Sequence, residues 1–151
     1  MKQGRTLTEL AQELERQAAS KKDFVADTRS LKLATTAAGT QLAVQNGETK
    51  HYNIGAHAHR QIADRVGIPA KYYERMLSEQ PQLLASNVNT WFDAKPERRL
   101  VRLLDGRTRA FLSDKFQRID HYDVVKTALP VLLNTKGVEV VSCEVTDARL
   151  Y

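Results

Sequence analysis

The dipeptide Asp105–Gly106 lies between two stretches in which apolar and polar residues alternate, and it constrains the fold more than any other feature of the chain. A two-residue turn between antiparallel strands needs positive φ at both central positions, which Asp-Gly readily adopts. Residues 98–113 are therefore predicted to form a β-hairpin. In a regular register Arg102 lies opposite Arg109, and successive side chains alternate between the two faces.

One face of this predicted hairpin is apolar and the other is basic. The apolar face carries Val101, Leu103 and Leu112, as expected for a face in the core. Like charges directly opposite each other on a sheet are unfavourable, so the basic face requires an anion. Acidic side chains of the protein could supply it, and so could phosphate groups, which match the planar fork of arginine. The basic face comprises Arg98, Leu100, Arg102, Leu104, Arg107, Arg109 and Phe111.

The charge of the chain is unevenly distributed. The formal net charge is +5, but residues 98–118 alone hold seven basic and two acidic side chains. A local cluster of this kind indicates a polyanionic partner more strongly than the net charge does. Aromatic residues lie within and beside this cluster, and basic groups interleaved with aromatic rings are typical of proteins that bind single strands.

The leading hypothesis is a protein that binds nucleic acid, with single-stranded DNA favoured, and that acts in recombination or replication. The pair Trp91 and Phe92 ends an apolar helical stretch and is predicted to belong to the core instead. The expected phosphate contacts are Arg98, Arg102, Arg107 and Arg109, with Lys115 and Arg118 at the rim and Phe111 as a stacking group.

Length and composition predict a single soluble globular domain. The chain has 151 residues, of which 42% are hydrophobic and 27% charged, and this is long enough to bury a core. No stretch is long enough to span a membrane, and the N-terminus lacks the pattern of a signal peptide. The one cysteine, Cys143, excludes an internal disulfide and favours a reducing, cytoplasmic compartment. It is predicted to be packed in a strand.

The elements fall in blocks, which predicts an α+β fold with an antiparallel sheet and helices packed mainly on one face. The last predicted strand runs to the end of the sequence. We therefore expect an N-terminal portion of a longer polypeptide, and pairing of that exposed strand between subunits of a homo-oligomer. The expected elements are a helix over 6–22 with a Thr6–Glu9 capping box, a β-meander over 24–54, a helical section over 56–94, the hairpin, a helix over 120–133 bent or shortened at Pro130, and a strand over 138–151.

Two other functions remain open. Residues 61–76 resemble a helix-turn-helix around Gly67, which would place Lys71, Tyr72 and Arg75 in the major groove of duplex DNA. Such a protein would be a regulator that binds double-stranded DNA. The third hypothesis is a non-catalytic module that acts on a host protein, in which the arginines are paired internally.

The sequence contains no recognisable catalytic or metal-binding pattern. The four histidines lack the spacing of a zinc site, and there is no nucleophile elbow, Walker loop or dinucleotide-binding glycine motif. We therefore predict that the protein is not an enzyme and that it holds no metal or cofactor.

Five segments in order resemble a phage/plasmid-like family that carries a domain of unknown function. The resemblance implies a gene carried on a phage, prophage or plasmid and a longer polypeptide, but no reaction. At the level of fold, the expected sheet, helix and basic hairpin are similar to phage single-strand annealing proteins, which often form rings or filaments. The matching segments are His59–Ala63, Gly67–Tyr73, Asn89–Trp91, Arg98–Asp114 and Ile119–Asp120.

Overall fold

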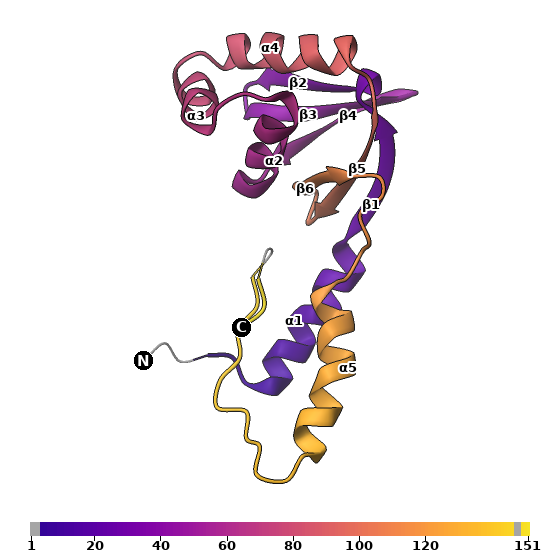
Figure 1. Ribbon diagram of the computed structural model, residues 1–151, viewed down its shortest axis with the longest axis vertical. Coiled ribbons are helices and arrows are strands. Elements are labelled where there is room, and N and C mark those ends of the chain that lie inside the picture. Colours follow the sequence, from indigo (N-terminus) through magenta and orange to yellow (C-terminus); the bar gives the residue numbers. More distant parts are fainter. Residues whose placement is uncertain (1–3, 147–148) are drawn as a thin grey trace. The chain divides into compact units, whose positions relative to one another are not determined.

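The chain forms two compact units in a computed structural model that describes residues 4–146 and 149–151 (Figure 1). The helical unit contains the described residues of 1–21 and 117–151, and the sheet unit contains residues 22–116. The predicted α+β class is confirmed, with a sheet that is mostly antiparallel. A single domain was expected, whereas the two ends of the chain form a unit separate from the central segment.

In the helical unit, helix α1 (Leu7–Ser20) begins where the sequence predicts. The Glu9 amide donates to Oγ1 of Thr6 at 3.2 Å, and the Thr6 amide donates to Oε2 of Glu9 at 2.7 Å. This reciprocal capping box satisfies two amides that the first turn leaves open. Leu10 and Leu14 of α1 pack in a small core with Cys143 and Val145.

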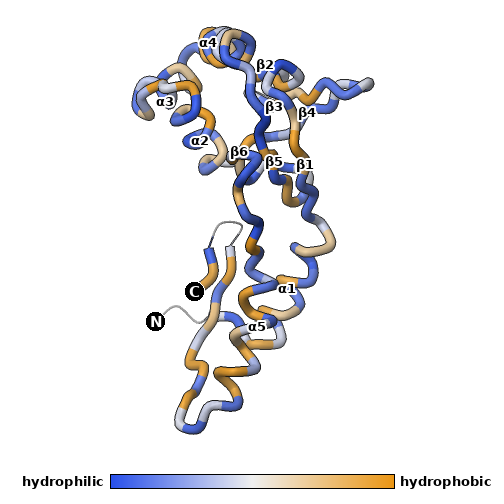
Figure 2. The backbone as a smooth tube through the Cα atoms, turned by 45° about the vertical axis from the view of Figure 1, so that its right-hand side comes forward, coloured by the Kyte–Doolittle hydropathy of each residue, from blue (hydrophilic) through white to orange (hydrophobic). Residues whose placement is uncertain are grey.

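Helix α5 (His121–Asn134) follows Asp120, which caps it with Asp123. Proline lacks an amide hydrogen and its ring crowds the preceding turn, so Pro130 was expected to bend or shorten the helix. The helix is not shortened there and continues to Asn134. None of its residues is fully buried in the described structure, and Figure 2 shows that much of it is hydrophobic.

The strand predicted over 138–151 is wrong for the part of it that the structure describes. Only isolated bridges form, and in one of them the Arg5 amide donates to the Cys143 carbonyl at 2.8 Å. The chain then turns back, so that Glu144 and Tyr151 exchange backbone hydrogen bonds of 3.2 and 2.9 Å. Positions 147–148 lie outside the described residues. An alternating sequence forms a strand only when it pairs with another strand. Because no such strand forms here in the described residues, the expected pairing of it between subunits has no support.

The sheet unit contains six strands in the order β1-β5-β6-β4-β3-β2. The hairpins β2–β3 and β3–β4 occur where turn residues predicted them, with positive φ at Gly39 and Gly47. The strands are β1 (Lys22–Asp27), β2 (Leu31–Thr36), β3 (Gly39–Asn46), β4 (Glu48–Ile54), β5 (Arg98–Leu104) and β6 (Arg107–Ser113), and a short 3-10 turn, Thr28–Ser30, separates β1 from β2.

The predicted meander over 24–54 is wrong in its first strand. Strand β1 pairs with β5 rather than with β2, so that Phe24 lies opposite Val101. Strand β4 meets β6 in parallel through only two residue pairs, Asn53 with Arg107 and Ile54 with Thr108. The basic hairpin therefore lies inside the sheet, with β1 along almost the whole of β5 and β4 along the first two residues of β6.

Helices α2 (Ala56–Val66), α3 (Ala70–Glu79) and α4 (Pro81–Ala94) lie together on one side of the sheet (Figure 1). The prediction that helices cover mainly one face is confirmed for this unit. Ile62, Tyr73 and Phe92 supply the helical side of the core, and Leu42 and Phe111 are among its buried strand residues.

The outer edge of β2 is closed by a side chain of α4. Oδ1 of Asn89 accepts the Leu33 amide at 2.7 Å, and its Nδ2 donates to the Leu33 carbonyl at 2.9 Å. One amide side chain thus takes the place of a neighbouring strand at this residue. This is one way to protect an edge that would otherwise be open to another chain.

Candidate nucleic-acid interface

The predicted Asp105–Gly106 turn is confirmed, since both residues have positive φ, 52° and 71°. The register beyond the turn differs from the prediction. Leu103 lies opposite Thr108, but Arg102 lies opposite Ala110, so Arg109 is an extra residue in a β-bulge. Because side chains alternate along a strand, this one residue moves everything after it to the other face.

Phe111 is therefore a core residue and not a stacking group, which corrects the prediction. It lies opposite Val101, is 0% exposed, and stacks on Phe92 with ring centroids 5.6 Å apart. The Arg99 guanidinium also lies over this ring, 5.0 Å from its centroid. No base can reach this ring in the folded protein.

Arg102 is also wrongly predicted as a phosphate contact. Its side chain is only 8% exposed, and its Nη2 lies 3.0 Å from Oδ2 of Asp23, which is equally buried. Leu100 and Leu104, on the same face of β5, are buried too. The acidic partner that the basic face required is, at Arg102, an aspartate of the neighbouring strand.

The remaining predicted phosphate contacts do not form one ridge. Arg98 and Arg107 are exposed at opposite ends of the hairpin, and six residues of strand place them about 20 Å apart. Arg109 is partly buried in the bulge, and Arg118, which is exposed, belongs to the helical unit. Lys115 is exposed in the turn that follows β6.

The two helices of the helix-turn-helix hypothesis are present. Helix α2 ends at Gly67, whose φ of 72° is left-handed, and α3 follows directly. Lys71, Tyr72 and Arg75 are exposed on α3, as predicted. Two acidic residues weaken this surface for DNA: Glu79 pairs with Arg75 at 3.1 Å, and Glu74 is also exposed.

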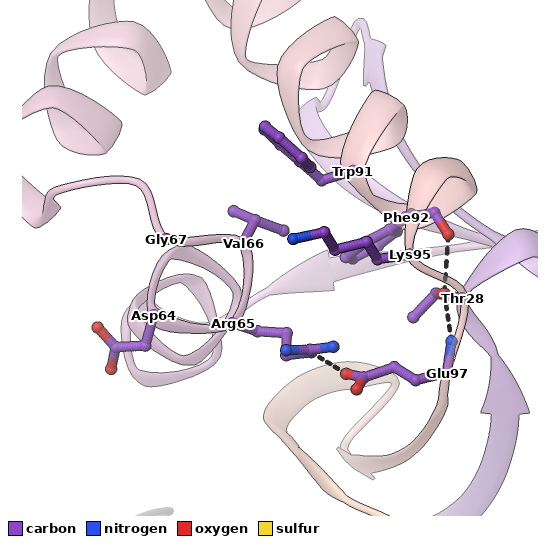
Figure 3. Close-up of a pocket in the computed structure, with 9 residues that line it drawn as sticks. All are labelled: Thr28, Asp64, Arg65, Val66, Gly67, Trp91, Phe92, Lys95 and Glu97. Atoms are coloured by element: carbon purple, nitrogen blue, oxygen red, sulfur yellow. Dashed lines mark hydrogen bonds and ion pairs between the residues drawn. The ribbon is translucent and has the colours of Figure 1, made fainter.

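A pocket of about 260 Å³ lies where the last turns of α2 and α4 meet the start of β5 (Figure 3). Glu97 forms ion pairs here with Arg65 and, at 3.3 Å, with Arg99. Thr28 holds the connection between α4 and β5. Its hydroxyl donates to the Phe92 carbonyl at 2.9 Å and accepts the Glu97 amide at 3.1 Å. Hydrogen bonds and ion pairs therefore hold Thr28 and Glu97 in place at this pocket.

Trp91 lies at this pocket and is 42% exposed, although its neighbour Phe92 is buried. The prediction that both belong to the core thus holds only for Phe92. Nζ of Lys95 lies 5.5 Å from the centroid of the Trp91 ring, and the lysine side chain extends across the pocket toward Val66 (Figure 3). The hairpin was expected to place an aromatic ring, Phe111, beside cations. Trp91 and Lys95 form such a pair instead.

Two exposed cations, Arg98 and Lys115, lie at the open end of the hairpin. Arg98 directly follows Glu97 of the pocket, and Arg99 lies opposite Ser113, two residues before Lys115. Neither Arg98 nor Lys115 forms an ion pair with any residue that the structure describes. Side chains alternate along β5, so Arg98 shares the face of Leu100 and Arg102, while Val101 and Leu103 face the helices. We therefore define the Trp91 surface as Trp91 and Lys95 alone.

Sequence reasoning identified Arg98 and Lys115 but missed Trp91 and Lys95. The four-residue spacing of Trp91 and Lys95 on a helix places them on one side, and this pattern could have indicated the pair. What the sequence could not show is which of two adjacent aromatic residues faces the sheet.

Comparisons with known proteins identify no relative: no family model matches the chain, and no curated protein or solved structure matches it significantly. The resemblance to a phage/plasmid-like family stays a prediction. Within the described residues, no helix is long and apolar enough to cross a membrane. Nor does that part of the chain bring together three or more histidine, cysteine, aspartate or glutamate side chains suited to a metal ion.

Proposed function

We propose that the sheet unit binds single-stranded nucleic acid, with DNA favoured, through the Trp91 surface. The observation that carries this proposal is the half-exposed indole of Trp91 with the Lys95 ammonium 5.5 Å from its ring centroid. Stacking of a base on an aromatic side chain contributes about 1–3 kcal/mol and is tolerant of sequence. A neighbouring cation attracts the backbone phosphate of the stacked nucleotide.

The electrostatics of the pocket indicate where the base and the phosphates would lie. Helices α2 and α4 both end here, and the carbonyl end of a helix disfavours an anion. Arg65 and Arg99 are already paired with Glu97, so these two guanidinium groups have an anion of their own. We therefore expect the base to lie against Trp91 and the nearest phosphate to lie outside the pocket beside Lys95. Arg98 and Lys115 are available to phosphates further along the strand.

A single strand suits this surface better than a duplex does. The face of a base is accessible to an indole in a single strand, but in a duplex it is covered by the adjacent base pairs. The duplex alternative relies on α3, where Glu74 and Glu79 accompany Lys71 and Arg75. The proposal also fits the cytoplasmic location that a single unpaired cysteine favours.

Trp91 is the only tryptophan in the chain, so its fluorescence reports directly on the proposed site. We expect oligo(dT) of about 20 nucleotides, longer than one small binding domain covers, to quench this fluorescence. The logarithm of the affinity should fall linearly with the logarithm of the salt concentration between about 50 and 200 mM. A duplex of the same length should bind more weakly.

Three variants test the assignment by anisotropy of a labelled oligonucleotide. Trp91→Ala and Lys95→Ala should each weaken binding by about tenfold, which corresponds to 1.4 kcal/mol. Lys50→Ala is the matched control, since Lys50 is an exposed lysine on β4 away from this surface. Equal affinity of all three variants would overturn the proposal, and no binding at low salt would favour the protein-interaction hypothesis. Faster pairing of two complementary strands would extend the function to annealing.

A further inference from the structure

A second pocket, of about 300 Å³, lies between α2 and α3 and is separate from the Trp91 surface. Each helix contributes residues at helical spacing, including His59 and Ala63 from α2 and Tyr73 and Leu77 from α3. Arg107, at the start of β6, reaches the same pocket. Five of its ten lining residues are apolar and the other five carry polar or charged groups, so it offers both an apolar wall and several partners for hydrogen bonds.

His59 and Tyr73 form a hydrogen-bonded pair in this pocket, with Nδ1 and the phenol oxygen 2.8 Å apart. Burial, and then the charge of Arg107, lower the pKa of His59 to about 4, so its imidazole is neutral at pH 7. Burial raises the pKa of Tyr73, which keeps its proton. If the Tyr73 hydroxyl donates to Nδ1, the imidazole carries its proton on Nε2, which can donate. If Nδ1 carries the proton and donates to the phenol oxygen, the hydroxyl hydrogen of Tyr73 can donate instead. Either arrangement leaves one donor for a ligand.

The two cations of the pocket form no ion pair among the described residues, although Glu74 also lines it. Arg60 and Arg107 both line it, and neither forms an ion pair with any side chain in the described part of the molecule. Arg107 also passes close to Gly55, the N-cap of α2: a Cβ on Gly55 would lie 3.6 Å from the arginine Nε. The amino end of a helix is positive, so a cation is disfavoured there unless an anion accompanies it.

We propose that this pocket binds a small organic anion, with a carboxylate or phosphate held by Arg107 and Arg60 and an apolar group against Ile54 and Leu77. The arginine fork matches both oxyanions. The donor of the His59–Tyr73 pair supplies a further hydrogen bond, and Glu74 at the wall disfavours ligands of high negative charge. This site goes beyond the proposed nucleic-acid function and uses none of the residues of the Trp91 surface.

The test uses phenyl phosphate, benzoate and inorganic phosphate as probes in isothermal titration calorimetry of the full chain. We expect phenyl phosphate or benzoate to bind, and the preferred one identifies the oxyanion. Inorganic phosphate should bind more weakly because it leaves the apolar wall unused. Arg107→Gln should weaken binding by at least about tenfold, since a hydrogen bond to a charged group contributes about 1.5–3 kcal/mol.

Arg75→Gln is the matched control, because Arg75 is an exposed arginine of α3 that does not line the pocket. Trp91→Ala should leave binding of these probes unchanged, so failure of the nucleic-acid proposal and failure of this one are distinguishable. Tyr73→Phe should also weaken binding, and urea unfolding of this variant and of Arg107→Gln, followed by Trp91 fluorescence, controls for loss of the fold. Absence of binding at millimolar probe, or equal affinity of Arg107→Gln and Arg75→Gln, would overturn the inference.

Discussion

Nη2 of Arg102 lies 3.0 Å from Oδ2 of Asp23 across the β1–β5 pair, and both side chains are only 8% exposed. Desolvation of two charges is costly, and the attraction between them offsets this cost only while both are present. The pair therefore joins two strands that are far apart in the sequence. The same ion pair explains why Arg102 is not available to a ligand.

The first prediction concerns this ion pair. Asp23→Ala should destabilise the sheet unit by about 3–5 kcal/mol, because it removes the carboxylate that compensates a buried guanidinium. The double variant Asp23→Leu with Arg102→Met should recover most of this loss, since apolar side chains of similar size often replace a buried ion pair without cost. Urea unfolding followed by Trp91 fluorescence measures both. A double variant no more stable than Asp23→Ala would contradict this account.

The second prediction separates the core role of Phe111 from the binding role that its sequence context suggested. Phe111→Ala should cost about 3–5 kcal/mol, because it leaves a cavity beside Phe92. Phe111→Leu should retain most of the stability and bind oligo(dT) as the unaltered protein does. Weaker binding by a folded Phe111→Leu protein would show that the ring acts on the ligand after all.

The turn was predictable because its requirements are local, whereas the bulge was not. Asp105 and Gly106 adopt positive φ, as the dipeptide indicates. The sequence around Arg109 does not indicate a bulge, because a bulge is defined by how the strand pairs with its partner. One unpredicted residue was enough to move Phe111 from the basic face to the core.

Long-range pairing limited the rest of the prediction. The turns at Gly39 and Gly47 place β2, β3 and β4 side by side, so the sequence was sufficient for them. Strand β1 instead joins β5, which lies more than 70 residues away, and no turn residue indicates that partner. The ion pair that neutralises Arg102 depends on this pairing, which is why the candidate site was misplaced as well as the strand.

Several residues of the family-like segments have structural roles. Asn89 closes the β2 edge, and Oε1 of Gln61 accepts the Phe111 amide at 2.7 Å. Such contacts explain why amide side chains occupy these positions without reference to a ligand. Trp91, by contrast, ends one of these segments on the surface.

The third prediction follows from Asn89. Asn89→Ala should cost about 1–3 kcal/mol, because two hydrogen bonds to Leu33 are lost at a partly buried edge. The same change should promote aggregation, measured by light scattering, since an uncovered edge strand can pair with another chain. Asn87→Ala on the same helix is the control, because the side chain of Asn87 makes no hydrogen bond within the described structure. Equal behaviour of the two variants would show that the edge needs no such cover.

The fourth prediction is a loss of stability in acid through His59. Its pKa in the folded protein is about 4, below the ordinary value of 6.5, because burial and Arg107 both disfavour the charged imidazole. Between these two pH values the unfolded chain binds more protons than the folded one, so the free energy of unfolding must fall as the pH falls from about 6.5 toward 4. Since one pKa unit corresponds to about 1.4 kcal/mol, the loss at pH 4.5 should be about 2 kcal/mol.

His59→Gln isolates this contribution, because glutamine can still bond to Tyr73 but does not titrate in this range. The difference in unfolding free energy between pH 7 and pH 4.5 should be smaller in His59→Gln by about 2 kcal/mol. His51→Gln, at an exposed position on β4, should change this difference little. Identical pH dependence of the unaltered protein and His59→Gln would mean that the imidazole is as accessible to protons in the fold as in the unfolded chain. The His59–Tyr73 pair could then not serve as the neutral donor on which the pocket between α2 and α3 relies.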